Sequence, residues 1–561
     1  MQLESHQPAG WHPTVLLSLL ALWLATLGNV PLWLKLAQVS ALQQPTQWVM
    51  FFGWGLFLWS AILAFTGFWI WPRWRKPAGL LLLLTGALSS HFMYSYSVVI
   101  DPTMWANVVN TDVREARDLL SGPLGWVLLM GFALPGWWWW RRAVRPVPRG
   151  RLVVQQVATV FGCLVLAVGV LWLGYQDMAS LMRNHKSLRY MINPFNTVYA
   201  ATRHNLGRAS HAQQPLRRLA EDAVLQAGAA SGGEAPLVLI VVGETARAAN
   251  VGLGGYARDT TPRLQQLMKR GDMVYFDQAS SCGTNTQTSV PCMFSAQTRL
   301  QYDPDLRQEN LLDVLQRAGL AVLWLDNQSG CKGVCERVTH SSAAKLLGPE
   351  RCPDGECPDG ALLEALPAGL ALLDPARRAR GTVVVLHQMG SHGPAYYRRT
   401  PPGFKVFGPE CQNTALTACR PEEIVNAYDN TIRYTDHVLA EAVAWLERQP
   451  QPAVLYYVSD HGESLGEKGL YLHGMPYGMA PKEQTHVPML MWWSPAYRAH
   501  HRLDLPCLRQ QASQPVSHDH LFHSVLGLAA VQTRTYLAAL DVAAPCRGEL
   551  LGFRGANPGA S

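Results

Sequence analysis

Hydrophobic and polar positions divide the chain into two parts of different character. The first third contains five apolar stretches, each close to the about 20 helical residues needed to cross a bilayer. They run from about Val15 to Leu34, Trp48 to Trp71, Ala78 to Ile100, Pro123 to Trp140, and Leu152 to Leu173. The first is longer than a signal-peptide core, lacks a small-x-small cleavage site and is followed by further spans. The pattern therefore predicts a multi-pass membrane domain with five helices.

The loops between these stretches indicate the orientation. Basic residues gather in two turns on the same side of the predicted membrane domain: Arg73, Arg75 and Lys76 in one, and Arg141, Arg142, Arg145, Arg149 and Arg151 in the other. The positive-inside rule assigns both turns to the cytoplasm. Five crossings from a cytoplasmic N-terminus then place everything after about Gly174 on the far side.

A chain of 561 residues is too long for one compact core. We expect a transmembrane domain over residues 1–174 and a soluble domain over 234–561. The region 175–233 between them mixes basic and apolar residues, which fits either interfacial helices on the bilayer or a solvated linker. The net charge of +7 is explained by the membrane turns, and no basic run in the soluble part is interleaved with aromatics. We therefore expect no nucleic-acid partner.

The soluble part alternates apolar runs with stretches of helical spacing. Strands buried on both faces are predicted for Ala235–Glu244, Thr382–His387 and Ala453–Asp460, with a weaker one at Ala321–Asp326, and helices for Leu311–Ala318 and Ile424–Leu446. This alternation predicts an α/β domain whose mostly parallel sheet is flanked by helices.

Possible metal ligands follow three of these runs. Glu244, His392, Asp460 and His461 come just after predicted strands, and His473 is close behind. Sites in open α/β sheets form at the carboxyl ends of the strands, so these side chains are expected to converge. Each one alone is more often a helix cap or a surface residue. Together their carboxylates and imidazoles predict a metal site, with zinc or manganese favoured over calcium.

A hydroxyl-rich segment from Ser280 to Cys292 is the candidate for a nucleophile. It offers Thr284, Thr286 and Thr288, and a helix beginning there would present backbone N–H groups to a phosphate. Metal coordination would lower the pKa of one hydroxyl and make it nucleophilic. The alternative is a Ser/Thr-rich capping loop, and chemistry alone does not choose among the three threonines.

The chain has eleven cysteines, of which Cys163 lies inside an apolar run and reads as a small buried hydrophobe. The other ten fall in the C-terminal half, and their spacing suggests the pairs Cys282/Cys292, Cys331/Cys335, Cys352/Cys357, Cys411/Cys419 and, by elimination, Cys507/Cys546. A structural zinc site is the competing interpretation. Five disulfides would require an oxidising compartment outside the cytoplasm, in agreement with the orientation of the spans.

Several of these segments resemble one known family. They are Val242-Gly-Glu-Thr-Ala-Arg247, Ser281-Cys-Gly-Thr-Asn-Thr286, Ser289-Val-Pro-Cys-Met-Phe294, Gly390-Ser-His-Gly-Pro394, Ser459-Asp-His-Gly-Glu-Ser464 and Leu472-His-Gly474. The set is similar to the phosphoethanolamine transferases, which include lipid A-modifying enzymes and the mobile colistin-resistance enzymes. The resemblance covers nearly the whole chain, and Asp-His-Gly is shared with the wider alkaline-phosphatase superfamily.

The resemblance implies an alkaline-phosphatase-like fold and specific roles. Thr286 resembles the nucleophile, and Glu244, Thr286, Asp460 and His461 resemble the ligands of one firmly bound zinc ion. His392 and His473 would bind the phosphoryl group or a second zinc ion, or act as acid and base. Lys332 resembles a substrate-phosphate contact. Gln328 is assigned to substrate binding as well, but it departs from the pattern, because some colistin-resistance relatives have Asn there, and the departure concerns the head-group contacts. Asn107, Thr111 and Glu115, spaced by four on one helical face, resemble residues that line the lipid head-group pocket.

The resemblance also implies a reaction and a location. Phosphatidylethanolamine would donate phosphoethanolamine to lipid A through a phosphothreonine, which would lower the negative charge of the outer membrane and give polymyxin resistance. We expect a monomer in the bacterial inner membrane with a periplasmic catalytic domain. Alternatives are transfer to a core sugar (heptose or Kdo), phosphoglycerol transfer, and a non-enzymatic lipid sensor. A sulfatase is disfavoured because no Cys-x-Pro-x-Arg motif occurs near Cys282 or Cys292.

Overall fold

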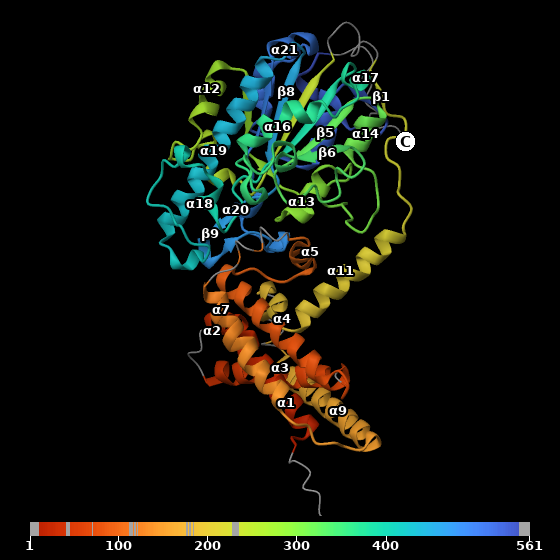
Figure 1. The fold of residues 1–561 in the computed structure, drawn as a ribbon, viewed down its shortest axis with the longest axis vertical. Helices are drawn as coiled ribbons and strands as arrows, with labels where there is room; N and C mark the ends of the chain where they lie inside the picture. The colour runs from red at the N-terminus through yellow and green to blue at the C-terminus, as the bar shows by residue number, and fades with distance from the viewer. Residues whose placement is uncertain are drawn as a thin grey trace, which may run out of the picture. The chain divides into compact units, whose positions relative to one another are not determined.

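The chain forms two compact units. The computed structural model describes residues 10–40, 45–69, 71–111, 116, 119, 122–175, 178, 181–182, 185–226 and 235–548. Met1–Trp105 and Leu120–His204 form the first unit, here called the helical unit, and Ala106–Leu119 and Asn205–Ser561 form the second, the α/β unit. In Figure 1 the membrane-length helices of the first are red to orange, and the sheet of the second runs from yellow-green to blue.

Four helical stretches of the helical unit are long and apolar enough to cross a membrane: Pro13–Val39, Gln47–Trp69, Arg75–Tyr96 and Arg149–Leu173. The first is built from α1 (Pro13–Thr26), a 3₁₀ turn (Leu27–Asn29) and α2 (Val30–Ser40), and the others correspond to α3 (Pro45–Trp69), α4 (Arg75–Tyr96) and α9 (Arg149–Leu173). The third apolar stretch leads into α5 (Pro102–Asn110), and α11 (Phe195–Gln213) follows the last. In the core, α3 packs against both α1 and α9.

The remaining apolar stretch, predicted over 123–140, is helical but interrupted. It consists of α7 (Gly122–Leu128), a π-helical turn (Leu129–Ala133) and α8 (Leu134–Arg141). The N–H of Leu134 bonds to the carbonyl of Leu129, five residues back. Pro135 follows directly, and a proline ring inside a helix removes one N–H donor and displaces the preceding turn. The wider turn accommodates that proline while the helix continues.

The α/β unit is built on a seven-stranded sheet in the order β3-β11-β8-β2-β7-β5-β6. The strands are β2 (Leu237–Gly243), β3 (Met273–Phe276), β5 (Ala321–Asp326), β6 (Thr339–Ser342), β7 (Thr382–His387), β8 (Ala453–Ser459) and β11 (Met489–Trp493). Pairing is parallel from β8 through β6, while β11 runs antiparallel to both β8 and β3. The predicted mostly parallel sheet is thus confirmed, with one antiparallel strand near its edge.

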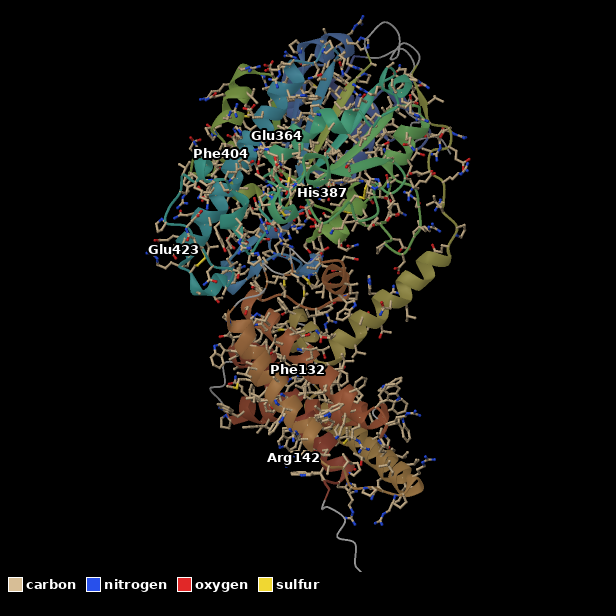
Figure 2. All side chains as sticks on the ribbon, viewed as in Figure 1. Phe132, Arg142, Glu364, His387, Phe404 and Glu423 are labelled. Atoms are coloured by element: carbon tan, nitrogen blue, oxygen red, sulfur yellow. A yellow bond between two sulfur atoms is a disulfide. The ribbon has the colours of Figure 1, made fainter. Side chains whose placement is uncertain are left out.

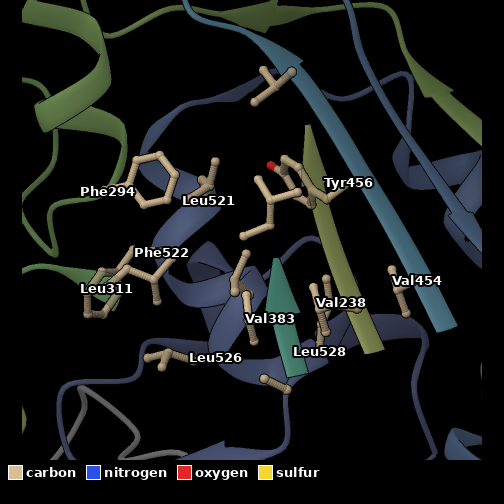
Figure 3. Close-up of a cluster of buried hydrophobic side chains, with 14 of the residues drawn as sticks. Val238, Phe294, Leu311, Val383, Val454, Tyr456, Leu521, Phe522, Leu526 and Leu528 are labelled. Atoms are coloured by element: carbon tan, nitrogen blue, oxygen red, sulfur yellow. The ribbon is translucent and has the colours of Figure 1, made fainter. Parts of the chain in front are cut away.

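Every residue of the central strands β2, β5, β7 and β8 is buried, because helices cover both faces. On one face, α14 (Leu311–Arg317) and α23 (Asp519–Leu528) contribute to a core cluster with Val238, Val383 and Val454 of the sheet (Figure 3). Helix α16 (Gly360–Leu370) contacts β5, and α19 (Pro421–Glu447) contacts both β8 and α12 (Pro262–Arg270). The three-layer arrangement leaves the carboxyl ends of the strands to carry the site.

Five disulfides close loops of the α/β unit: Cys282–Cys292, Cys331–Cys335, Cys352–Cys357, Cys411–Cys419 and Cys507–Cys546. They are the pairs that the spacing suggested, and Cys163 is a buried free cysteine on α9. In this structure these ten cysteines do not act as ligands of a structural zinc site, the interpretation that competed with disulfides.

Candidate active site

The ends of two neighbouring parallel strands bring together three possible metal ligands. Strand β2 runs into Glu244 and β8 runs into Asp460 and His461, with Gly243 paired to Ser459 in the last step of the register. All three side chains are fully buried, and one ligand atom from each lies within 4.8 Å of the others. Parallel strands end at one edge of the sheet, which is why residues more than 200 positions apart can meet here.

Thr286 is placed beside this cluster as the first residue of α13 (Thr286–Met293). Its hydroxyl lies 3.1 and 3.2 Å from the two oxygens of Glu244 and 3.3 Å from Nε2 of His461. By contrast, the Thr284 hydroxyl donates to the carbonyl of Met475 at 2.6 Å. The three candidate threonines have chemically equivalent hydroxyls but different positions in the structure. Among the contacts of the described residues, the hydroxyl of Thr286 is the one that touches Glu244 and His461.

The ring of His461 is oriented by its own backbone neighbour. Nδ1 lies 2.9 Å from the carbonyl oxygen of Gly462, which can only accept, so Nδ1 carries the donated proton. That leaves Nε2 directed to the carboxylates, 3.4 Å from Oε1 of Glu244 and 3.3 Å from Oδ2 of Asp460. Once its Nε2 proton is lost, an imidazole held this way would present a lone pair to a metal ion.

Burial and mutual charge shift the three ionisable groups in different directions. Burial raises the pKa of Asp460 to about 6, and the charge of Glu244 adds to this rise. For His461, burial lowers the pKa, but the charges of Asp460 and Glu244 outweigh it and raise the value to about 9. Burial also works against the charged form of Glu244, yet its contacts with His461 hold its pKa well below the usual range. Negative charge is therefore concentrated where a cation would be stabilised.

The donor set fits a metal ion. Oδ2 of Asp460 is buried and accepts no well-formed hydrogen bond from the described residues, and its polar neighbour there is Nε2 of His461 at 3.3 Å. Its other oxygen accepts from the N–H groups of Thr245 (3.1 Å) and His461 (2.7 Å). A buried carboxylate oxygen without a donor requires compensation, and a cation supplies it. Two carboxylates, an imidazole and a hydroxyl could hold one ion in the tetrahedral arrangement that zinc prefers.

Two further histidines lie against this cluster. The ring of His473 is 4.3 Å from that of His461 and 5.8 Å from that of His392, measured between centroids. Nδ1 of His473 lies 2.7 Å from an oxygen of Glu463, whose other oxygen accepts from the hydroxyl of Tyr396. The sequence signalled the histidines but not Glu463, although it stands inside the Asp460–Ser464 segment.

The loop that carries His392 is fixed to Glu244 by close backbone packing. Gly390 has φ +53°, and a Cβ atom there would lie 2.5 Å from the carbonyl oxygen of Glu244. The N–H of Ser391 donates to that same carbonyl at 3.0 Å. Asp359 accepts from the N–H groups of Met389 and Gly390, each at 2.8 Å. Only glycine meets both the left-handed conformation and the close approach.

A buried His–Asp pair lies at the ends of β7 and β5, the next strands along the sheet, and was not anticipated from the sequence. Nδ1 of His387, which is labelled in Figure 2, is 2.8 Å from Oδ1 of Asp326. Burial lowers the pKa of His387, but Asp326 outweighs that effect and the value is raised. The amide of the neighbouring Gln388 is fully buried, and neither of its atoms has a partner among the described residues.

A chain of hydrogen bonds connects Lys332 with the cluster. Gln328 donates from Nε2 to Oε2 of Glu244 at 2.9 Å, and its carbonyl oxygen accepts from the Ser329 hydroxyl at 2.6 Å. Lys332 donates in turn to that hydroxyl at 2.7 Å. Lys332 has φ +50° in the short loop closed by Cys331 and Cys335. The ammonium group is therefore held by a constrained backbone and remains half-buried.

The predicted head-group residues are only partly described. Asn107 lies on α5 and Thr111 directly after it, and the Thr111 hydroxyl donates to the Asn107 carbonyl at 2.8 Å, as one helical face requires. Neither side chain forms a hydrogen bond with the cluster within the described part of the chain. Glu115 lies outside the described residues.

Comparison with known proteins decides the family. The sequence model described as phosphoethanolamine transferase EptA/EptB matches residues 58–207, and the sulfatase model matches residues 236–531. The chain is 41% identical to phosphoethanolamine transferase EptA of Salmonella typhimurium, over 83% of this chain and 85% of that protein. It belongs to the phosphoethanolamine transferase family. Residues 236–531 thus match the sulfatase model, although they lack the Cys-x-Pro-x-Arg modification motif of sulfatases near Cys282 and Cys292.

Two further similar proteins support the same family assignment. The phosphatidylethanolamine transferase Mcr-1 of Escherichia coli is 35% identical, over 86% of this chain and 89% of that protein. The solved structure of the integral membrane lipooligosaccharide phosphoethanolamine transferase A of Neisseria meningitidis matches with a TM-score of 0.91 at 35% identity. That match covers 96% of this chain and 99% of the other.

Proposed function

We propose that this transferase moves phosphoethanolamine from phosphatidylethanolamine to lipid A. The observation that carries the proposal is the contact of the Thr286 hydroxyl with Glu244 and His461 at the end of two parallel strands. A buried hydroxyl touching a carboxylate and an imidazole is the arrangement of an activated nucleophile. Its place at the beginning of α13 adds the positive end of a helix, which favours an incoming phosphate.

In the first half-reaction, Oγ1 of Thr286 attacks the phosphorus of the donor lipid. A bond forms between that oxygen and phosphorus while the bond from phosphorus to the glycerol oxygen breaks. Thr286 then carries the phosphoethanolamine group as a phosphodiester, and the proton lost from its hydroxyl is passed to the leaving glycerol oxygen, which gives diacylglycerol. In the second half-reaction, a phosphate oxygen of lipid A attacks the same phosphorus, the bond from phosphorus to Oγ1 breaks, and Oγ1 takes up a proton to restore the Thr286 hydroxyl. His392 and His473 are the proposed proton carriers and phosphoryl contacts.

Glu244, Thr286, Asp460 and His461 are the proposed ligands of one zinc ion, with His392 and His473 as a possible second position. Bound zinc would lower the pKa of the threonine hydroxyl and stabilise negative charge on the phosphoryl oxygens. The unpartnered Oδ2 of Asp460 supports a cation at this position. Gln328 orients Glu244 by its hydrogen bond, so that both carboxylate oxygens face the hydroxyl.

Donor recognition is proposed to involve a cation and polar groups. Lys332 carries the charge that would meet the donor phosphate, and its ammonium group is held by Ser329. Asn107, Thr111 and Glu115 are the proposed contacts of the ethanolamine head group. Of these, Glu115 has the negative charge that an ammonium group would require.

The proposed location is the bacterial inner membrane, with a cytoplasmic N-terminus and the α/β unit in the periplasm as a monomer. The five disulfides support the compartment, because they persist in the oxidising periplasm. Adding a phosphoethanolamine group to lipid A introduces a positive charge at the bacterial surface. Polymyxins are polycations, so the expected consequence is resistance to polymyxin and colistin.

The test is mass spectrometry of lipid A from a host without its own phosphoethanolamine transferases that expresses this protein. Wild type should add a phosphoethanolamine-sized increment, and Thr286→Ala should add none. The matched control is Thr288→Ala, two residues further along α13, which should retain the increment. Equal modification by wild type and Thr286→Ala would refute the nucleophile. An increment found on core-sugar fragments, with lipid A unmodified, would refute the acceptor.

A further inference from the structure

A cavity of about 520 Å³ opens in the helical unit, at the end where α4 and α9 begin and α8 ends. This volume falls within the range of about 300–1,000 Å³ that is usual for small-molecule sites. Its lining includes the basic residues Arg73, Arg75, Lys76 and Arg145 together with apolar residues such as Trp140 and Leu152. A cavity with four cationic side chains and apolar walls suits a ligand that has both an anionic and an apolar part.

Arg75 is the residue that most requires a ligand. Only 4% of its surface is exposed, and its Nε atom is buried without a hydrogen-bond partner. Its side chain forms no ion pair or hydrogen bond with any residue that the structure describes. Burying a guanidinium group without a partner is unfavourable, since it loses hydration without replacement. An anion in the adjoining cavity would supply the missing acceptor.

The surrounding protein offers no carboxylate to supply it. The sequence contains no Asp or Glu from residue 5 to 100 or from residue 119 to 176. Eight Lys and Arg residues cluster in the two turns at this end and in the adjoining ends of α4, α8 and α9: Arg73, Arg75, Lys76, Arg141, Arg142, Arg145, Arg149 and Arg151. Arg75 is also the first residue of the 22-residue α4, where the helix dipole adds positive charge. The compensating negative charge must therefore come largely from outside this unit.

Two of the neighbouring cations are already engaged by the protein. Lys76 donates to the carbonyl of Trp140 at 2.8 Å and lies over the ring of that residue. Arg142 (labelled in Figure 2) lies over the ring of Trp138, at 4.8 Å from its centroid. The N–H of Arg145 donates to the carbonyl of Trp11 at 3.0 Å, which ties its loop to the beginning of the chain. The side chains of Arg73, Arg75 and Arg145 are therefore left to contact a ligand. The contacts of their neighbours with tryptophans hold this part of the protein in place.

The aromatic residues indicate that this ligand is a lipid. Trp71, Trp74 and Trp137 near the same end of the bundle are 46%, 65% and 60% exposed. Exposed tryptophans at the end of apolar helices are typical of the membrane–water interface, where phospholipid head groups lie. Free phosphate would gain no binding energy from the apolar walls of the cavity. A phospholipid would place its phosphate on the arginines and its acyl chains along the apolar walls.

We propose that this cavity binds the phosphate head group of an anionic membrane phospholipid, with Arg75 as its central contact. A lipid with net negative charge, such as phosphatidylglycerol, compensates the arginines. A zwitterionic lipid leaves the site with its positive excess. This site belongs to the helical unit and is separate from the site at Thr286, so it does not depend on the proposed transfer reaction.

The test is native mass spectrometry of the full-length protein in detergent, titrated with phosphatidylglycerol, phosphatidylcholine or inorganic phosphate. Wild type should retain phosphatidylglycerol in preference to both. Arg75→Gln should weaken that binding at least about tenfold, as expected for the loss of a charge-assisted contact. Arg151→Gln, an exposed arginine of α9 that does not line the cavity, should change it by less than about twofold.

A second readout keeps the proposal testable if Arg75→Gln folds poorly. Lipid that binds only the folded protein raises the melting temperature, and the rise grows with the logarithm of lipid concentration above the Kd. Phosphatidylglycerol should raise the melting temperature of wild type and of Arg75→Lys, but less in Arg73→Gln. Equal retention of phosphatidylglycerol and phosphatidylcholine would overturn the proposal, as would inorganic phosphate that binds as tightly as the lipid. Tighter lipid binding in Glu4→Gln would also overturn it, since it would identify Glu4 as the partner of Arg75.

Discussion

Nδ1 of His473 lies 2.7 Å from Oε2 of Glu463, and Glu463 is fully buried. The second oxygen of the carboxylate accepts from Tyr396, so Glu463 is held from both sides. A carboxylate that accepts from Nδ1 fixes the tautomer of the imidazole and leaves Nε2 available. We therefore expect Glu463 to be a positioning residue that acts on the proposed site through His473, whose ring lies 4.3 Å from that of His461.

Glu463→Gln should therefore lower transferase activity by about 10- to 100-fold, the usual effect of losing a carboxylate that orients a catalytic or metal-bound histidine. The buried volume is nearly unchanged, so the melting temperature should stay close to that of wild type. The measurement is turnover of a labelled phosphatidylethanolamine, with the pH profile recorded for both proteins. A purely structural role would lower the melting temperature and leave the shape of the pH profile unchanged.

The same coupling predicts non-additive kinetics. If Glu463 acts only through His473, then Glu463→Gln should have little further effect in a His473→Gln background. Independent, additive losses in the double variant would contradict that relationship. Tyr396→Phe is the matched control, because it removes one donor to Glu463 and keeps the ring in place; it should lower activity less than Glu463→Gln does.

Chelation of the proposed metal ion should abolish phosphorylation of Thr286 while leaving the fold largely intact. The ligand atoms of Glu244, Asp460 and His461 lie within 4.8 Å of each other, so without a cation the carboxylates repel each other at short range. The measurement is trapping of the phosphothreonine after dialysis against a chelator, with metal content determined in parallel. Asp460→Asn should lower metal content to less than about a tenth, and unchanged metal content would refute Asp460 as a ligand.

The sequence was informative for the sheet because its central strands are buried on both faces. The runs at Leu237–Gly243, Thr382–His387 and Ala453–Ser459 are continuously apolar, and this pattern has few alternatives. Because parallel strands end at one edge, the convergence of Glu244, Asp460 and His461 could also be predicted. The choice of Thr286 over Thr284 required coordinates or the family resemblance, since the two hydroxyls are chemically equivalent.

Other features depend on contacts that no local pattern encodes. Glu463 gives no signal of its own, because a glutamate after a strand is usually exposed. The pairing of His387 with Asp326 depends on β5 and β7 being neighbours in the sheet, although they are more than 50 residues apart. The π-helical turn at Leu129–Ala133 could not be predicted from hydropathy either, because hydropathy gives the length of an apolar stretch and not its hydrogen-bond pattern.

The disulfides should differ in their contribution to stability according to the length of chain that they close. Cys507–Cys546 spans 39 residues and Cys331–Cys335 spans 4. In the chain-entropy model the longer loop contributes about 4 kcal/mol and the shorter about 2 kcal/mol. We expect the Ser/Ser variant of the 507–546 pair to lower the melting temperature of the full-length protein in detergent more than the 331–335 variant. A larger effect of the short loop would show that native-state contacts dominate.

Acid should destabilise the α/β unit through its buried histidines, of which His501 is the clearest. Burial, aided by the nearby His500 and Arg547, lowers the pKa of His501 to about 3. Its ring stacks on Tyr497 at 4.0 Å, and its buried Nδ1 has no partner among the described residues. Because the folded pKa is below the ordinary value of about 6.5, its contribution is complete above pH 6.5 and is lost as pH falls towards 3.

At pH 5 the unfolded chain binds this proton and the folded protein does not, which costs about 2 kcal/mol of folding free energy for His501 alone. His501→Phe keeps a ring against Tyr497 and removes the titration, so the melting temperature of that variant should fall less between pH 7 and pH 5 than that of wild type. The matched control is His340→Phe, at an exposed position of β6, which should keep the wild-type pH dependence. If the melting temperatures of wild type and His501→Phe fall by the same amount between pH 7 and pH 5, His501 is not the group whose protonation destabilises the protein.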